Sequence, residues 1–257
     1  MITISGFTFV HNAIDSGYPI VEAIMAVQPY VNDMFVVDMQ STDDTREVLE
    51  KLKAKSKLIQ KSITILDGEW GNQAGETLRQ AHSKYIECSG DVIVHFEADE
   101  VFDDRLIEKI RAKIKHGYHS LTVYRLQIEA NFQRCRWYPE PVHRVFPRLS
   151  GSKKDGHTTD QHHGAYTLMP KNGYVWDITN CFRDNWTNRV IKQAELRDTE
   201  PQYIATPLHI LHEAELTRVG AEKWLRDSDF WHWSTTPFDI PKVLKPLVGM
   251  TKYKARL

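Results

Sequence analysis

Residues 91–102 read Asp-Val-Ile-Val-His-Phe-Glu-Ala-Asp-Glu-Val-Phe, and this stretch decides the fold. Its apolar, β-branched beginning is typical of a buried parallel strand. The strand runs into the acids Glu97, Asp99 and Glu100, and a helix is predicted to begin at Asp103–Asp104. Ligands of open α/β sheets bind beyond the carboxyl ends of the strands, so we expect a ligand here. Glu97 and Asp99 alternate along an extended chain, and their carboxylates are expected to share one cation or one ribose. A solvated acidic turn is the alternative.

The sequence around this stretch alternates between predicted strands and predicted helices. Short apolar runs predict strands at residues 2–9, 34–38 and 62–66. Apolar residues at helical spacing predict helices at residues 19–27, 44–52, 74–85 and 104–116. This order of elements is typical of a doubly wound parallel sheet, so the predicted fold class is α/β.

Beyond residue 118 the pattern changes. Strands are predicted at 121–128 and 142–149, joined by a basic, aromatic segment, and residues 150–164 form a polar segment predicted to be a loop. Helices are predicted near 188–198 and 213–227, followed by a short basic tail from residue 237.

Composition places the chain among globular proteins. Hydrophobic residues make up 41% of its 257 residues and charged residues 26%, and the net charge of -1 argues against nucleic-acid binding through bulk charge. The N-terminus lacks the basic residues and cleavage site of a signal peptide, and no apolar run is long enough to span a bilayer. The isolated cysteines Cys88, Cys135 and Cys181 are expected to be reduced thiols, which predicts a cytoplasmic protein.

Four motifs then occur in a characteristic order. Ser5–Asn12 (SGFTFVHN) is followed by Val36–Thr45 (VVDMQSTDDT), by Glu97–Glu100 (EADE) and by Trp137–Arg148 (WYPEPVHRVFPR). This order resembles the GT-A nucleotide-sugar glycosyltransferases of the family 2-like group, in which the third motif is Asp-x-Asp. The likeness covers residues 1–149 well and the remainder loosely.

The resemblance implies a GT-A, Rossmann-like, mostly parallel sheet flanked by helices, with a smaller α+β acceptor-side region toward the C-terminus. Residues 1–118 would form the half that binds the nucleotide sugar, and residues 119–236 the acceptor-side half. Residues 237–257 would be a C-terminal tail.

The resemblance also implies roles for residues of the nucleotide-binding half. Asp38 would accept a hydrogen bond from the base, most often uracil, and Phe7 and Thr8 would frame that base. Glu97 takes the ribose-contacting position and Asp99 the metal-binding position. Arg79 is a candidate for a fixed charge near the phosphates, with a solvated helix face as the equal alternative. The sequence departs from the family at Met39, where the family has a second Asp, and at Glu97.

A divalent cation suits the predicted chemistry independently of the family. A nucleotide sugar leaves as a diphosphate, and a cation that bridges its oxygens acts as a Lewis acid. Mn²⁺ and Mg²⁺ prefer carboxylate oxygens and keep positions open for phosphate. GT-A enzymes often add a late histidine to the metal shell. His209 and His212 are the candidates, and His212 is preferred; a buried structural histidine is the alternative.

An inverting transfer needs a base within hydrogen-bond reach of the acceptor hydroxyl. Asp155 and Asp160 in the polar segment are candidates, together with Glu140, and the sequence does not choose among them. The leading hypothesis is a metal-dependent glycosyltransferase, inverting by resemblance. It would move a sugar from a nucleotide donor, UDP-sugar by preference, to a glycan or lipid-linked glycan.

Two other functions fit the same sequence. In the first, the acceptor is a modified DNA base, as in some viral glycosyltransferases, and basic and aromatic residues hold the DNA. These residues are Arg134, Arg136, Arg144, Arg148, Lys153, Lys154, Trp137, Tyr138 and Phe146. In the second, the chain is a non-catalytic nucleotide-binding module of the same fold.

Overall fold

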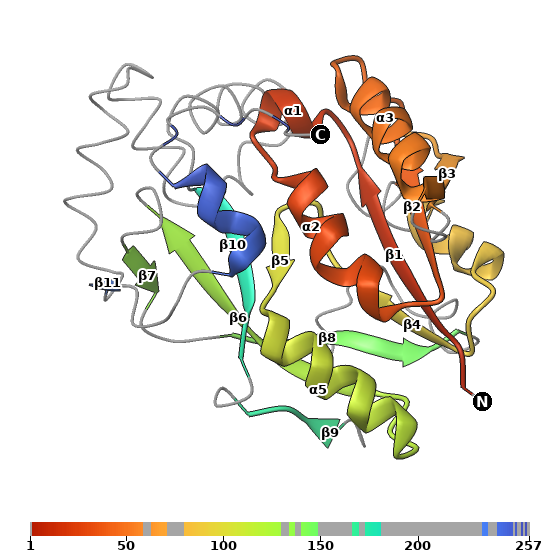
Figure 1. Cartoon of the computed structure of the whole chain (residues 1–257), viewed down its shortest axis with the longest axis vertical. Coiled ribbons are helices and arrows are strands. Elements are labelled where there is room, and N and C mark those ends of the chain that lie inside the picture. The colour runs from red at the N-terminus through yellow and green to blue at the C-terminus, as the bar shows by residue number, and fades with distance from the viewer. Residues whose placement is uncertain are drawn as a thin grey trace, which may run out of the picture.

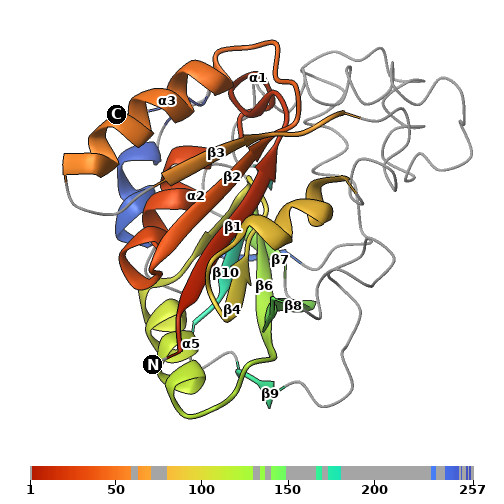
Figure 2. The same cartoon turned by 90° about the vertical axis from the view of Figure 1, so that its right-hand side faces the viewer.

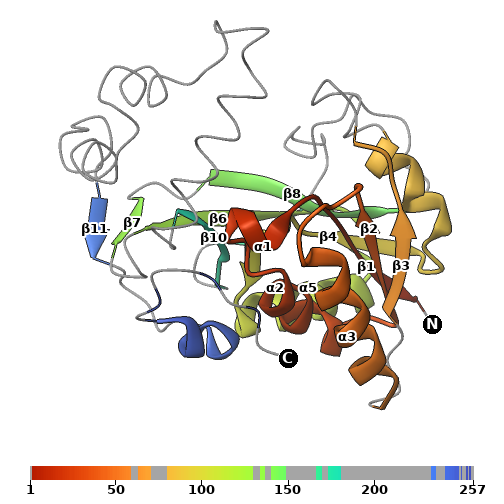
Figure 3. The same ribbon diagram turned by 90° about the horizontal axis from the view of Figure 1, so that it is seen from above.

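The computed structural model describes most of the first 150 residues and short stretches of the remainder. The described residues are 2–58, 63–70, 80–129, 134–136, 140–148, 166–169, 173–180, 233–235, 241–248, 250, 253 and 255. A central twisted sheet carries helices α2, α3 and α5 on the same face (Figures 1 and 3). The predicted loop at 150–164 and the predicted helices near 188–198 and 213–227 lie outside the described residues.

Four parallel strands form the N-terminal half of the sheet in the order β3-β2-β1-β4 (Figure 2). Their bounds are β1 Ile4–Val10, β2 Asp33–Asp38, β3 Ile63–Asp67 and β4 Val92–His95. Each lies where an apolar run predicted a strand, and the parallel α/β arrangement is confirmed.

Short and long helices connect these strands. They are α1 Ala13–Ser16, α2 Ile20–Val27, η1 Gln28–Tyr30, α3 Thr45–Leu58, η2 Lys84–Glu87 and α5 Asp104–Lys115. Helix α5 begins as the sequence predicted, because the Asp103 side chain caps it by accepting a hydrogen bond from the Arg105 backbone N–H. Leu106, Ile107, Ile110 and Ile114 are its buried positions.

Antiparallel strands continue the sheet beyond β4. The remaining strands are β5 Glu100–Phe102, β6 Leu121–Glu129, β7 Arg134–Arg136, β8 Glu140–Pro147, β9 Tyr166–Thr167, β10 Val175–Asn180 and β11 Trp233–Thr235. The order from β4 is β8-β6-β7-β11, and β10 pairs with β5 and β6. The sheet is therefore mixed, and strands from both sides of residue 118 belong to it.

Apolar side chains form one core on each face of the sheet. The larger core lies under α2 and α5, while the smaller one joins Phe7, Met39, Tyr85 and Phe146 with their neighbours. Side chains alternate between the faces of a strand, so Phe7 and its neighbour Thr8 point to opposite sides of β1. Both are fully buried.

The C-terminal residues that the structure describes pack back onto α2. Leu244 and Leu247 of η6 (Lys242–Leu247) are buried in the larger core together with Tyr253. The Tyr253 hydroxyl donates a 2.9 Å hydrogen bond to Glu22 on α2, and both residues are buried. This segment thus helps to hold α2 against the sheet. None of the described helices is long and apolar enough to cross a bilayer.

Candidate active site

The carboxyl ends of β1, β2 and β3 meet at one edge of the sheet. Val10, Asp38 and Asp67 are paired in register at this edge. The turn after β1 is tied to the turn after β2 through Asn12, whose φ of 48° is left-handed. Its side-chain oxygen accepts a 2.7 Å hydrogen bond from the Thr42 N–H. The two turns consequently form one connected surface.

Asp38 ends β2 at the centre of this edge and is only 6% exposed. One carboxylate oxygen accepts a 3.1 Å hydrogen bond from the Ser41 N–H, so the side chain shapes the turn that follows. The other oxygen lies 3.6 Å from Nη1 of Arg46, which also pairs with Asp67. The carboxylate predicted to read the base is thereby held in one orientation.

An aromatic pair lies next to Asp38. The His11 and Trp70 rings stack with centroids 4.0 Å apart and an angle of 17° between their planes. His11 Nδ1 donates to the Met39 carbonyl at 2.7 Å, and its Nε2 lies 3.1 Å from the Asn12 side-chain amide. Trp70 is 37% exposed, so a flat surface borders the edge where Asp38 lies.

Phe7, Thr8 and Met39 lie in the interior around the same edge. Phe7 packs in the smaller core against Tyr85, with ring centroids 4.4 Å apart. Thr8 is fully buried, and Met39, which replaces the family's second Asp, is buried in the same core as Phe7. The ring of Phe7 therefore exposes no surface to a ligand in this structure, and a base contact by Phe7 or Thr8 stays a prediction.

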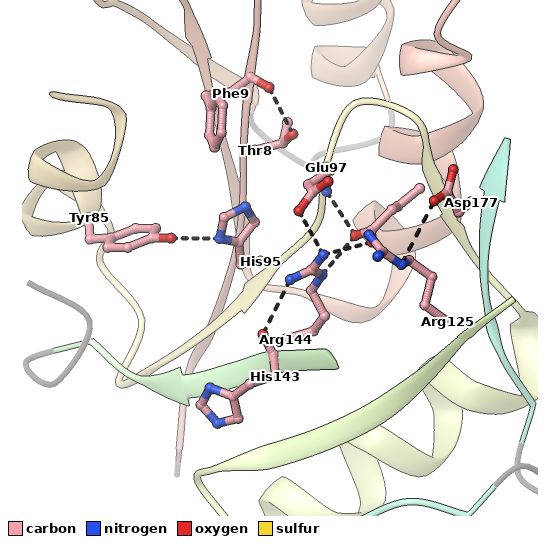
Figure 4. Close-up of polar contacts among 10 residues, drawn as sticks. Thr8, Phe9, Tyr85, His95, Glu97, Arg125, His143, Arg144 and Asp177 are labelled. Carbon is pink, nitrogen blue, oxygen red and sulfur yellow. Dashed lines mark hydrogen bonds and ion pairs between the residues drawn. The ribbon is translucent and has the colours of Figure 1, made fainter. Parts of the chain in front are cut away.

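The acidic turn after β4 is organised by a buried arginine on β8 (Figure 4). Arg144 donates from Nε and Nη2 to both oxygens of Glu100, at 2.8 and 2.7 Å, and from Nη2 to Glu97 at 2.8 Å. Arg144 and Glu100 are 0% exposed, whereas the Glu97 side chain is 38% exposed. The first acid of the motif is thus paired with an arginine.

A second arginine extends the network. Nη1 of Arg125, on β6, lies 3.8 Å from Oε1 of Glu100, and its Nε lies 3.8 Å from Oδ2 of Asp177 on β10. Burial opposes ionisation of Glu100, but Arg144 and Arg125 outweigh it and hold the pKa of Glu100 below its ordinary value. Burial raises the pKa of Glu97, and Arg144 offsets this only in part. The carboxylates of this network therefore differ in how readily they take up a proton.

Asp99, the predicted metal ligand, lies in the same turn and is half-buried. Within the described part of the chain, no three His, Cys, Asp or Glu side chains gather as a metal cage. One or two carboxylates that leave room for substrate phosphates are the usual donor set for Mg²⁺ or Mn²⁺. The oxygen donors of this turn fit such a cation better than they fit zinc.

A buried polar pair lies behind the acidic turn. The Tyr85 hydroxyl and His95 Nδ1 are 2.6 Å apart, and both residues are almost completely buried (Figure 4). Burial lowers the pKa of His95 well below its ordinary value, with Arg144 and His82 adding to the effect. His95 is therefore neutral at physiological pH and supports the end of β4 without carrying charge.

The structure does not test the roles of several predicted site residues. Arg79, Asp155, Asp160 and His212 lie outside the described residues. Glu140 begins β8, and its backbone pairs in register with Arg125. Its side chain is not among those that the structure describes. Their roles stay predictions.

The partner of the acidic turn was not predicted from the sequence. The prediction that Arg144 and Phe146 could help to hold DNA was wrong, because both are buried. Arg144 lies where the pairing of β8 with β6 shifts register, between His143 and Val145, so simple alternation along β8 does not reveal what its side chain meets. His11 and Trp70 were also missed, because a stacked pair from two loops has no local signal.

Residues 8–176 match the model of Glycosyl transferase family 2, which is well over half of the chain. No curated protein matches. A mannosyltransferase from Pyrobaculum calidifontis, solved with GDP-Man and Mn²⁺, is 13% identical with a TM-score of 0.47 over 88% of this chain and 70% of its own. TarS 1–349 from S. aureus is 13% identical, with a TM-score of 0.46 over 89% and 73%. Glucosyl-3-phosphoglycerate synthase from Mycobacterium tuberculosis is 20% identical, with a TM-score of 0.34 over 48% and 44%.

Proposed function

The chain belongs to glycosyl transferase family 2, and we propose that it is a metal-dependent enzyme that moves a sugar from a nucleotide donor to an acceptor hydroxyl. The observation that carries this proposal is the position of two acids, Asp38 and Asp99. Asp38 ends β2 and Asp99 lies in the turn after β4, and both of these strands pair directly with β1. Ligands of such sheets bind beyond these carboxyl ends.

In this proposal the nucleotide base lies against Asp38. The carboxylate accepts a hydrogen bond from a ring N–H, as uracil N3 offers, and UDP-sugar is therefore the preferred donor class. The exposed His11–Trp70 stack supplies an aromatic surface beside Asp38. Glu97 keeps its proposed place near the ribose and Arg79 its place near the phosphates. Phe7 and Thr8, whose side chains are buried, would act on the base only through the position of β1.

Asp99 would hold Mn²⁺ or Mg²⁺ together with the donor diphosphate, with His212 as the proposed additional ligand. The cation, when bound, supplies electrostatic stabilisation of the charge that develops on the departing diphosphate. In this proposal Asp38 binds the base, and Asp99 and Arg79 orient the diphosphate at the edge of the sheet. Half-burial of Asp99 lowers the local dielectric and strengthens its attraction for a cation.

The transfer is proposed to invert the sugar's configuration in one displacement. Asp155, Asp160 or Glu140 would take the proton of the acceptor hydroxyl, which requires one of them within hydrogen-bond reach of it. The acceptor is proposed to be a glycan or a lipid-linked glycan. Burial of Arg144 and Phe146 removes part of the surface that a DNA acceptor would need.

Thermal unfolding with a panel of nucleoside diphosphates and nucleotide sugars, with and without Mn²⁺, tests this function. A ligand at about 100 times its Kd adds about 2.7 kcal/mol to the stability of the folded protein. We expect Mn²⁺-dependent stabilisation in the wild type and its loss in Asp99→Asn. Glu108→Gln, which changes an exposed acid on α5, is the control and should behave as the wild type.

Release of sugar from the stabilising donor completes the test. Stabilisation without release in the presence of Mn²⁺ and glycan acceptors would favour the non-catalytic module. No stabilisation by any nucleotide, with or without Mn²⁺, would contradict the proposed donor site.

A further inference from the structure

We infer that Arg144 is a positioning residue that sets the metal affinity of the acidic turn by clamping the residues on both sides of Asp99. This inference rests on the proposed function, because it takes Asp99 as the ligand of the divalent cation. It goes beyond that function by assigning the control of the turn to a residue on another strand.

The guanidinium closes a ring of hydrogen bonds around the turn. Arg144 bonds to Glu97 at one end of the turn (Figure 4). At the other end it bonds to Glu100. The turn is closed again by its backbone, because Glu100 N–H donates to the Glu97 carbonyl at 3.0 Å. The Glu97 N–H donates in turn to the Glu100 carboxylate at 3.1 Å. The backbone that carries Asp99 is therefore held at both ends.

Arg144 is itself held by a rigid element. Its strand, β8, pairs with β4 through Ile93–Phe146 and Val94–Val145, immediately before the acidic turn. On its other side β8 pairs with β6, the strand that supplies Arg125, and Arg144 lies where this pairing shifts register, between the paired residues His143 and Val145. A functional group placed by a paired strand is located more accurately than one placed by a loop. The bonds from Arg144 to Glu97 and Glu100, called the clamp here, thus fix the turn relative to the sheet.

Charge gives the clamp a second effect. Three acids occur within four residues of the turn, and their mutual repulsion would open it without a cation among them. Arg144 engages two of these acids, Glu97 and Glu100, and its own pKa is raised by them despite its burial. Glu100 is 0% exposed and does not touch a ligand, so it would act on a bound cation through its bonds to Arg144 and through its charge.

The test measures metal-dependent nucleotide binding directly, without turnover. UDP, or the nucleoside diphosphate that stabilises the wild type best, is titrated into the protein by calorimetry in Mn²⁺ and again in EDTA. The ratio of the two Kd values reports the coupling between cation and nucleotide. The variants are Arg144→Lys and Glu100→Gln, which keep approximate size, with Asp99→Asn as reference. Arg111→Lys, which makes the same exchange at an exposed position of α5, is the control.

We expect Arg144→Lys and Glu100→Gln to reduce the ratio about tenfold, a loss of about 1.4 kcal/mol of coupling. The Kd in EDTA should stay at the wild-type value, which shows that the base site is intact and the variant folded. Arg111→Lys should retain the ratio within about twofold. Should Arg144→Lys fail to fold, Glu100→Gln decides the matter by comparison with Asp177→Asn, which removes another buried acidic charge, one that contacts Arg125.

A folded Arg144→Lys or Glu100→Gln variant with the wild-type ratio would overturn the positioning role and leave the proposed function standing. A wild-type ratio of one would instead contradict the metal dependence, and a wild type that binds no nucleotide would contradict the donor site.

Discussion

Arg144 and Glu100 form a two-point ion pair in the interior, with nitrogen–oxygen distances of 2.8 and 2.7 Å and no exposed surface on either side chain. The two residues are 44 positions apart and meet because β8 lies beside β4. An ion pair of this kind does not by itself imply high stability, since desolvation of both charges opposes the attraction. Removal of one partner, however, leaves a buried charge without compensation.

Arg144→Met should therefore be strongly destabilising. We expect the free energy of unfolding to fall by about 3–5 kcal/mol, because the Glu100 carboxylate stays buried without its arginine. Arg125→Met, which removes the 3.8 Å contacts with Glu100 and Asp177, should cost less, because Arg144 still compensates the charge of Glu100. Urea unfolding of both variants at neutral pH measures the difference, and equal losses would contradict the assignment of Arg144 as the central partner.

Stability should depend on pH through His95. The pKa of folded His95 is depressed by burial, so the unfolded chain takes up a proton near pH 6.5 while the folded chain does not. The contribution of neutral His95 is fully present above that pH and is lost as the pH falls below it, by up to about 1.4 kcal/mol per pH unit.

His95→Phe removes this titration and isolates the effect from the other histidines. The unfolding free energy of the wild type minus that of the variant, measured from about pH 5 to pH 8, should decrease as the pH falls. The unpaired Tyr85 hydroxyl adds a constant offset that does not change with pH in this range. A difference independent of pH would show that the pKa of His95 is the same in the folded and unfolded states, which would contradict the prediction.

The Cys88 thiol should be unreactive in the folded protein. Cys88 is 1% exposed, and burial raises its pKa to about 12, with Asp33 adding to the shift. The thiolate is the reactive form, so alkylation should be at least about 100-fold slower than in urea. Iodoacetamide labelling of Cys135→Ser/Cys181→Ser, which leaves Cys88 as the remaining thiol, measures this rate. Equal rates in buffer and urea would refute the prediction.

Tyr253→Phe tests how the C-terminal segment stabilises α2. The change removes the hydroxyl that bonds to Glu22 and leaves a buried carboxylate oxygen without that donor. We expect a loss of about 1–3 kcal/mol in unfolding free energy. Tyr118→Phe removes a hydroxyl from a ring that is 40% exposed and should change stability little. Equal effects of the two substitutions would mean that the Glu22 contact contributes nothing.

Trp70→Ala tests the aromatic surface beside Asp38. If the base lies against the His11–Trp70 stack, the variant should bind UDP more weakly by about 1–3 kcal/mol, the range found for bases on aromatic side chains. Inorganic pyrophosphate has no base, and its affinity should be unchanged. A parallel loss for UDP and pyrophosphate, measured by calorimetry, would place the effect of Trp70 elsewhere.

The sequence by itself determined the parallel half of the fold and the edge at which the acids lie. The apolar runs of β1, β2 and β4 are local signals, and Asp103 marks the start of α5 through its own hydrogen bond. Because parallel strands end at the same edge, the positions of Asp38 and Asp99 followed from the order of elements alone.

The tertiary structure decided which charges meet. The sequence predicted Arg144 to be one of the basic residues that would hold DNA, yet β8 lies antiparallel beside β4 and brings Arg144 to Glu97 and Glu100. Likewise, the 231 positions between Tyr253 and Glu22 contain no local signal of their contact. Hydrophobic periodicity depends on neighbouring residues, whereas a buried ion pair requires two strands to be brought together by the packing of the whole sheet.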